Sequence, residues 1–330
     1  MTALNIFEYH LQQVTTLLEK AAKQKNPALW LYRNNGRTPF FMLEGLAKLH
    51  AELHNKKKFS KLKERFKLVE DAIGAIDYYD AFAKSFAANK KIPKNITTYL
   101  QAQSREKIQS LNELLEEEGW LSGKRLKKVN EKLNEAGWLK PADEVNAIKD
   151  FYGEAIYGIV SFVNESGFRF DNVEADVHEL RRKLRWLSIY PQALRGLVQL
   201  DASRKAPKNI MPYLTKEVTS SPFNVMPDAG DNTHFLVLDR NYFYALSWII
   251  AELGRLKDSG LAIIAIREAL QQQGTVDDKK AYTEAKKMLG SKQPSLEDIL
   301  SSSASISKTF FENHVLEYLV VGTADVKQGT

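Results

Sequence analysis

Apolar residues near the start of the chain recur at alternating steps of three and four, and this spacing constrains the fold more than any other feature. Such steps return a side chain to one face of an α-helix, so they predict a helix with an apolar stripe against its neighbours. Similar stepping recurs over residues 59–76. Only 17 glycines and 10 prolines interrupt the 330 residues, which favours long helices. The first stripe comprises Leu4, Phe7, Leu11, Val14, Leu18 and Ala21.

Most of the remaining chain also has helical patterning, and strand-like alternation is confined to residues 233–238. We therefore predict an all-α fold. The further helices are expected at residues 39–53, 96–118, 124–136, 142–163, 177–199, 240–257, 261–273, 279–289 and 295–320.

The chain carries a weak internal repeat. Residues 67–86 align with residues 247–266, and each segment holds a glycine in an I/L-G-x-I/L pattern. Upstream of each segment lies a pair of arginines four positions apart. We expect two pseudo-symmetric antiparallel helical bundles, residues 1–165 and 166–330, forming one compact unit. The arginine pairs are Arg33 with Arg37 and Arg181 with Arg185.

Basic charge is concentrated in two windows. Residues 33–67 hold ten Lys and Arg against three Glu, and residues 178–208 hold eight against two acidic residues. The windows carry +7 and +6, whereas the whole chain carries +6. This segregation indicates an anion-binding surface, although a Lys-rich helix face in solvent remains the alternative.

The sequence DVHELRRKLRWL, residues 176–187, contains the densest cationic face. His178, Arg181, Arg182 and Arg185 stand at i, i+3, i+4 and i+7, so a helix would align them on one side. Guanidinium groups bind phosphate oxygens through two parallel hydrogen bonds, and a histidine can add a donor. A linear polyanion would suit this row, while pairing with carboxylates elsewhere in the bundle is the alternative.

The motif V-H-E-L-R-x-x-L-R followed by L-G-x-L-K-D resembles the CHAD family, the conserved-histidine α-helical domain, and the first half supports this through Arg33, Arg37 and I-G-A-I-D. The resemblance implies two bundles around a basic central cavity that binds inorganic polyphosphate. Trp30 stands where alignment on the first arginine pair would place a histidine. The resemblance implies His178, Arg181, Arg185, Arg33, Arg37 and Lys257 as ligands, with Asp80 and Asp258 orienting basic side chains.

The helical faces alone add four candidate ligands. Arg182 belongs to the row just described. A second cationic stripe lies on the helix expected at residues 59–76 and consists of Lys57, Lys61 and Arg65, spaced four apart.

Most catalytic motifs are absent. The sequence has no phosphate-binding loop, G-x-G-x-x-G, H-E-x-x-H or G-x-S-x-G pattern, and no cysteine. His50 and His54 have a zinc-like spacing, but two histidines beside lysines supply too few ligands, so we expect no metal or cofactor. Asp, Glu and His do not form a recognisable hydrolase set.

We therefore expect a non-catalytic protein that binds polyphosphate or another phosphate-rich polyanion. A nucleic-acid-binding protein and a helical scaffold without an anion ligand are the alternatives; a phosphohydrolase would need metal-binding carboxylates. The chain has no signal-like start and no apolar run approaching the ~20 residues that span a bilayer, so we expect a cytoplasmic protein without membrane contact.

Overall fold

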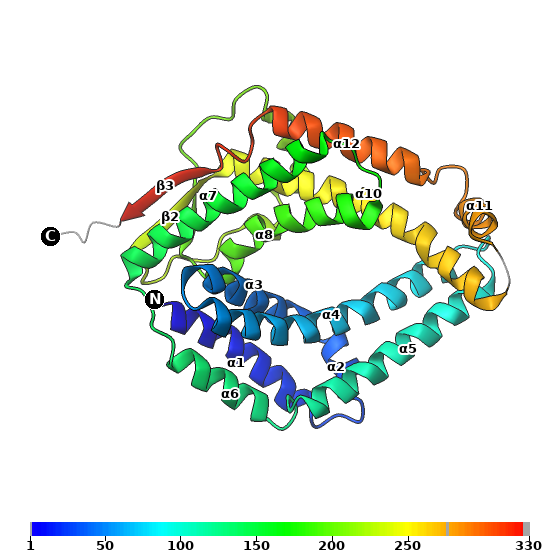
Figure 1. Ribbon diagram of the computed structural model, residues 1–330, viewed down its shortest axis with the longest axis horizontal. Coiled ribbons are helices and arrows are strands. Elements are labelled where there is room, and N and C mark those ends of the chain that lie inside the picture. Colours follow the sequence, from blue (N-terminus) through cyan, green and yellow to red (C-terminus); the bar gives the residue numbers. More distant parts are fainter. Residues whose placement is uncertain (1, 275–276, 326–330) are drawn as a thin grey trace.

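The computed structural model describes residues 2–274 and 277–325 (Figure 1). Helices dominate these residues, which confirms the predicted all-α class. No helix in this part of the chain combines the length and apolarity needed to cross a membrane. The helices are α1 (Ala3–Ala21), α2 (Pro27–Arg33), α3 (Arg37–Leu53), α4 (Lys56–Ala87), α5 (Lys94–Glu117), α6 (Lys124–Asn134), α7 (Pro141–Ser166), α8 (Glu179–Ala193), α9 (Lys216–Thr219), α10 (Arg240–Gln273), α11 (Asp278–Leu289) and α12 (Leu296–Glu312).

The first predicted apolar stripe forms as expected. Thr2 caps α1 by accepting a hydrogen bond from the Asn5 backbone, and every predicted stripe residue except the half-buried Leu4 is buried. The stripe on α4 is buried completely. The apolar periodicity therefore identified both the helices and the sides that face the core.

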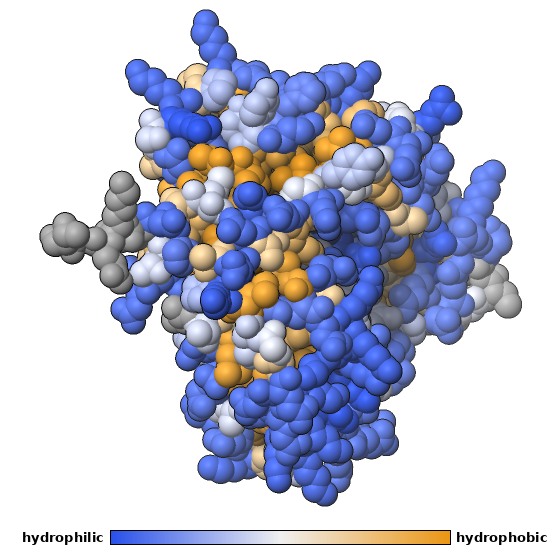
Figure 2. All heavy atoms as spheres, turned by 60° about the vertical axis from the view of Figure 1, so that its left-hand side comes forward, coloured by the Kyte–Doolittle hydropathy of each residue, from blue (hydrophilic) through white to orange (hydrophobic). Residues whose placement is uncertain are grey.

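A small sheet lies at one end of the molecule. β1 (Val198–Asp201) pairs in parallel with β2 (His234–Asp239), and β2 pairs antiparallel with β3 (Val320–Asp325). The predicted strand at 233–238 is confirmed as β2, whereas β1 and β3 were not predicted and overlap the expected helices only at residues 198–199 and 320. Helix α7 contacts both β2 and β3. Figure 2 shows the face at this end, where hydrophilic side chains predominate and apolar ones appear between them.

Two predicted helices extend too far. The helix expected at 177–199 ends at Ala193, because Arg195 and Gly196 adopt positive φ angles of 48° and 91°. The space at Gly196 is also restricted, since an added Cβ would lie 2.3 Å from the Asp228 carbonyl oxygen. Its start differs as well: a π-helical turn, Val173–His178, precedes α8. The helix expected at 295–320 ends at Glu312, and His314 has a φ of 52°.

Helix α10 joins what we predicted as two helices, 240–257 and 261–273. The intervening Gly260 does not end the helix. A Cβ there would lie 3.2 Å from a Val173 methyl group, so the glycine permits close packing between the π-helical turn and α10. Here the glycine serves packing rather than helix termination.

Two apolar clusters hold the fold together. The larger contains residues from both predicted halves, among them Phe7, Phe66, Leu187 and Leu246. The smaller, which we call the distal cluster, joins α4 and α5 to α10 and α11. Both long helices, α4 and α10, contribute residues to both clusters. Each therefore runs from one cluster to the other (Figure 1). The distal cluster consists of Ala83, Phe86, Ile92, Ile96, Leu100, Ile263, Ala265, Ile266, Ala269 and Ala285.

Helix α7, which the predicted boundary assigns to the first half, packs on α3 and also on the sheet and α8. The division at residue 165 and the pseudo-symmetry therefore stay predictions.

Candidate functional site

An arginine lies against the motif glycine in each predicted half. A Cβ built on Gly74 in α4 would lie 2.7 Å from a terminal nitrogen of Arg37, and one on Gly254 in α10 would lie 3.0 Å from Arg181 Nε. Because glycine has no side chain, each guanidinium group can pack directly against the helix that carries the glycine. In the predicted repeat, these contacts favour an alignment of Arg37, rather than Arg33, with Arg181. Such an alignment has an offset of 144 positions and sets Asn34, instead of Trp30, against His178.

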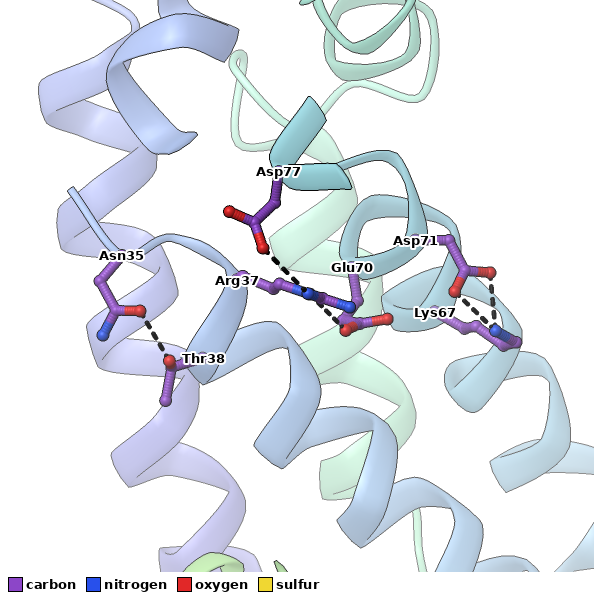
Figure 3. Close-up of polar contacts among 7 residues, drawn as sticks. All are labelled: Asn35, Arg37, Thr38, Lys67, Glu70, Asp71 and Asp77. Carbon is purple, nitrogen blue, oxygen red and sulfur yellow. Dashed lines mark hydrogen bonds and ion pairs between the residues drawn. The ribbon is translucent and has the colours of Figure 1, made fainter. Parts of the chain in front are cut away.

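Carboxylates hold Arg37 in place, as Figure 3 shows. Arg37 Nε donates to a Glu70 oxygen at 2.7 Å, and a terminal nitrogen lies 3.9 Å from Asp77. Burial raises the pKa of Glu70, although the Arg37 charge opposes that shift. The turn before α3 is fixed by Asn35, whose side chain accepts a 2.7 Å hydrogen bond from Thr38 Oγ1.

Three neighbouring cations are half-buried without a paired carboxylate among the residues described, 2–274 and 277–325. Arg181 Nε donates to the Ile250 carbonyl oxygen at 3.1 Å. The Arg185 guanidinium lies 4.6 Å from the centre of the Phe41 ring. Lys48 Nζ lies 4.7 Å from the centre of the Trp186 ring. Aromatic faces and a carbonyl thus support these charges, and no ion pair neutralises them.

The pKa shifts of Arg185 and Lys48 reflect burial and repulsion by neighbouring cations. Burial, followed by the charges of Arg181 and Arg37, lowers the pKa of Arg185 to about 10. Burial and the Arg182 charge lower the pKa of Lys48 to about 8. Burial also lowers the pKa of Arg181, against the opposing charge of Asp258. Cations that repel each other in a desolvated region favour a bound anion.

Glu44 is a buried carboxylate whose charge acts on both Lys48 and Arg185. Burial and the nearby Glu70 charge raise its pKa to about 7, while Lys67 and Lys48 pull it down. Near neutral pH, Glu44 is therefore only partly ionised and compensates the cations incompletely.

His178 and Lys257 adjoin the same group. Burial lowers the pKa of His178, and the charges of Lys257 and Arg181 add to that effect, while Glu174 opposes it. His178 Nδ1 lies 3.3 Å from Glu174, and Lys257 Nζ lies 2.7 Å from Asp258. Only 14% of the Lys257 side chain is exposed. We use the term central basic site for Arg37, Lys48, His178, Arg181, Arg182, Arg185 and Lys257.

Arg182 lies at the exposed edge of this site. Its guanidinium group contacts Glu179 at 2.7 Å. Asp258, expected to orient a basic side chain, does so by pairing with Lys257. The structure thus gathers six predicted ligands and one predicted supporting residue.

The predicted stripe of Lys57, Lys61 and Arg65 lies on another side of α4. Arg65 and Gly74 are nine positions apart, which at about 100° per residue places them half a turn from each other. Arg65 binds Glu118 at 2.5 Å, and Arg125 binds the same carboxylate. The structure therefore separates this stripe from the central basic site.

The charge of Arg33 acts on Asp80 rather than on the cations of the central basic site. Arg33 ends α2 close to Asp80, which accepts a 2.7 Å hydrogen bond from Tyr32 and pairs with Lys84 at 2.6 Å. Burial raises the pKa of Asp80, but the hydrogen bonds from Lys84 and Tyr32 outweigh it and lower the pKa, helped by the Arg33 charge. Asp80 thus orients Tyr32 and Lys84 directly.

Lys48 was missed as a site residue. Its spacing from Arg37 could have indicated it in the sequence. The two residues are eleven positions apart, which is about three helical turns, so both side chains lie on the same side of α3. The sequence could not show that α8 covers this side with Arg185 and Trp186.

A separate group of potential metal ligands was also missed. His50 and His54 on α3 meet Glu144 on α7, and one ligand atom from each lies within 4.8 Å of the others. We expected no metal because the histidine pair offered only two ligands; the fold supplies a third.

Comparisons with known proteins provide no relative. No protein-family model matches the chain, and no curated protein matches it significantly. Support for a function therefore comes from the geometry of the residues themselves.

Proposed function

We propose that this chain is a non-catalytic polyanion-binding protein whose ligand is inorganic polyphosphate or another linear, phosphate-rich anion. The observation that carries the proposal is the group of half-buried cations, Lys48, Arg181 and Arg185, that pair with no carboxylate among the described residues. Buried charges are normally paired, so this group indicates a missing anion.

The type of cation favours phosphate. Two guanidinium groups one helical turn apart on α8 can each bind phosphate oxygens in a forked geometry. Arg37 on α3 approaches the same region from the first half, as its effect on the pKa of Arg185 shows. An extended anion could contact all three, whereas a single phosphate would reach fewer. The resemblance to the CHAD family implies the same ligand class.

The position of the cations favours a single chain of phosphates over a duplex. Arg181, Arg185 and Lys48 are half-buried between helices rather than displayed on an exposed face. Duplex DNA presents its phosphates on a wide, rigid surface, which needs exposed Lys and Arg.

The test is a titration of the purified chain with medium-chain polyphosphate at two salt concentrations, with orthophosphate and duplex DNA as competitors. The key variant is Arg181→Ala with Arg185→Ala. Each charge-assisted hydrogen bond contributes about 1.5–3 kcal/mol and about 1.4 kcal/mol is a tenfold change in affinity, so we expect at least about a hundredfold weaker binding.

The matched control is Lys127→Ala with Lys128→Ala, which removes the same charge from exposed positions on α6. We expect this control to retain polyphosphate affinity within about threefold, because exposed charges contribute little. Equal affinity of the control and a folded arginine double variant would refute the central basic site. Equal or tighter binding of duplex DNA would support the nucleic-acid alternative instead.

A further inference from the structure

Two histidines and a glutamate meet inside the protein, away from the central basic site. His50 Nδ1 lies 3.4 Å from one Glu144 oxygen, and His54 Nε2 lies 3.3 Å from the other. At most 6% of any of these three side chains is exposed. His50 lies in the last turn of α3, His54 directly follows the end of that helix, and Glu144 lies in the first turn of α7, which packs beside α3.

The atoms that face one another lack hydrogen bonds. His50 Nδ1, His54 Nε2 and both Glu144 oxygens are buried without a hydrogen-bond partner among the described residues. Buried polar atoms in folded proteins are almost always satisfied, and a cluster of exceptions indicates a bound ion or water. A buried carboxylate also needs a compensating positive charge.

The side chains that pack against the histidine rings are aromatic and carry no charge. Phe7, Phe59 and Trp138 each pack against the His50 ring at 5.3–5.6 Å between ring centres. The two histidine rings stack at 5.1 Å.

We propose that His50, His54 and Glu144 bind a divalent transition-metal ion, with Zn²⁺ the best fit. Two imidazole nitrogens and a carboxylate form a common three-residue ligand set for zinc. Zinc–ligand bonds of about 2.0–2.1 Å in a tetrahedron separate the ligand atoms by about 3.3–3.4 Å. Each histidine nitrogen lies at about this distance from a different oxygen of Glu144, and one ligand atom from each of the three residues lies within 4.8 Å of the others.

A pocket lies next to the cluster. It has a volume of about 290 Å³, opens beside His54 and is also lined by Lys58, Phe59 and Glu135. Lys58 hydrogen-bonds to the carbonyl oxygen of Glu135 at 3.1 Å, so its ammonium group is held at the pocket wall. This site is independent of the polyanion proposal.

The decisive experiment measures metal binding directly. The chain is treated with EDTA, dialysed and titrated with Zn²⁺ by calorimetry, and with Co²⁺ while its visible absorption is recorded. We expect one ion per chain and the intense visible bands of tetrahedral Co²⁺. Glu144→Gln keeps the size of the side chain but removes its charge, and it should weaken Zn²⁺ binding at least about tenfold.

The control is His314→Ala, which removes an exposed histidine paired with Glu317 outside the cluster, and it should bind metal as the unchanged protein does. His54→Gln provides a second ligand variant should Glu144→Gln fail to fold, as judged by circular dichroism. Absence of stoichiometric binding by the unchanged protein would overturn the proposal, and so would equal affinity in a folded ligand variant. Polyphosphate binding by Glu144→Gln should stay unchanged, which separates the two proposals.

Discussion

Glu44 gives the clearest prediction for a single residue. Its side chain is buried, and its pKa of about 7 lies above the ordinary value of 4.5. Between these values the folded state holds a proton that the unfolded state has released, so the contribution of Glu44 to stability is lost as pH rises from 4.5 through 7. Glu44→Gln should remove this loss and make the free energy of unfolding rise more steeply with pH, by up to about 1.4 kcal/mol per pH unit.

Urea denaturation at several pH values between 4.5 and 7 measures this slope. Glu52→Gln is the control on the same helix, because half of the Glu52 side chain is exposed and its charge is solvated. Equal slopes in the two variants would show that Glu44 titrates normally. His10 acts in the opposite direction, since burial lowers its pKa to about 4, and it is present in both variants.

Individual residues also show how far the sequence could define the site. The spacing of His178, Arg181 and Arg185 correctly placed them along one helical region, because that relation depends only on local geometry. Glu144 could not be linked to His50, since 94 positions separate them and the link depends on how α7 packs against α3. Local order is encoded by spacing, whereas the identity of a distant partner is not.

At the scale of elements, Gly254 shows how a helix can be adapted to hold an arginine. Gly254→Ala places a methyl group 3.0 Å from Arg181 Nε, which must shift and weaken its hydrogen bond to Ile250. Replacing glycine by alanine stabilises the helix by about 0.5–1 kcal/mol, and losing the hydrogen bond destabilises the protein by about 1 kcal/mol, so the two effects nearly cancel. We therefore expect little change in the free energy of unfolding and about tenfold weaker polyphosphate binding.

Gly158→Ala on α7 is the matched control. Nothing lies within 4 Å of a Cβ at this exposed helical position, so the substitution should stabilise the protein by about 0.5–1 kcal/mol without altering polyphosphate affinity. Thermal unfolding and the same titration measure both effects. Unchanged affinity in Gly254→Ala would mean that the contact between Arg181 and α10 does not position a ligand-binding group.

Apolar stripes and glycines explain where the prediction of helices succeeded and where it failed. Long apolar stripes identified α1 and α4, because a stripe reports both the period and the buried side. A break was predicted between residues 257 and 261, although Gly260 in that interval provides space for Val173 inside the continuous helix α10. Gly196 does end a helical run, but it was passed over. A glycine alone does not reveal whether it serves a turn or a close contact.

At the scale of the whole molecule, α4 and α10 position the central basic site by spanning two apolar clusters. The larger cluster includes Ile73 and Leu253, each immediately before its motif glycine, and the distal cluster resumes at Ala83 and Ile263. On α10 the buried residues between the two clusters are Gly254 and Gly260, whereas on α4 the larger cluster extends to the buried Ile76. Charge windows in the sequence could not distinguish the central basic site from the outer stripe at Lys57, since Arg37 and Lys57 lie in the same basic window and only packing assigns their sides.

The distal cluster should therefore open as a unit of its own. Tyr79 on α4 and Tyr99 on α5 donate hydrogen bonds of 2.9 and 2.8 Å to one oxygen of Glu268 on α10. These hydrogen bonds link α4 and α5 to α10 beside the distal cluster. Tyr79→Phe with Tyr99→Phe leaves this carboxylate without either donor. We expect the free energy of unfolding to fall by about 2 kcal/mol, because hydrogen bonds to charged groups are the stronger ones and Glu268 is only half-buried.

Hydrogen exchange followed by mass spectrometry tests where that stability is lost. Exchange should accelerate in residues 83–100 and 263–274, while residues 59–76 in the larger core keep their protection, because opening is local when contacts to one cluster are weakened. Tyr157→Phe, which removes the hydroxyl of a tyrosine that is 75% exposed, should leave both regions unchanged. Equal acceleration in the two regions would show instead that α4 and α10 transmit the loss to the larger core, so that both clusters unfold in a single step.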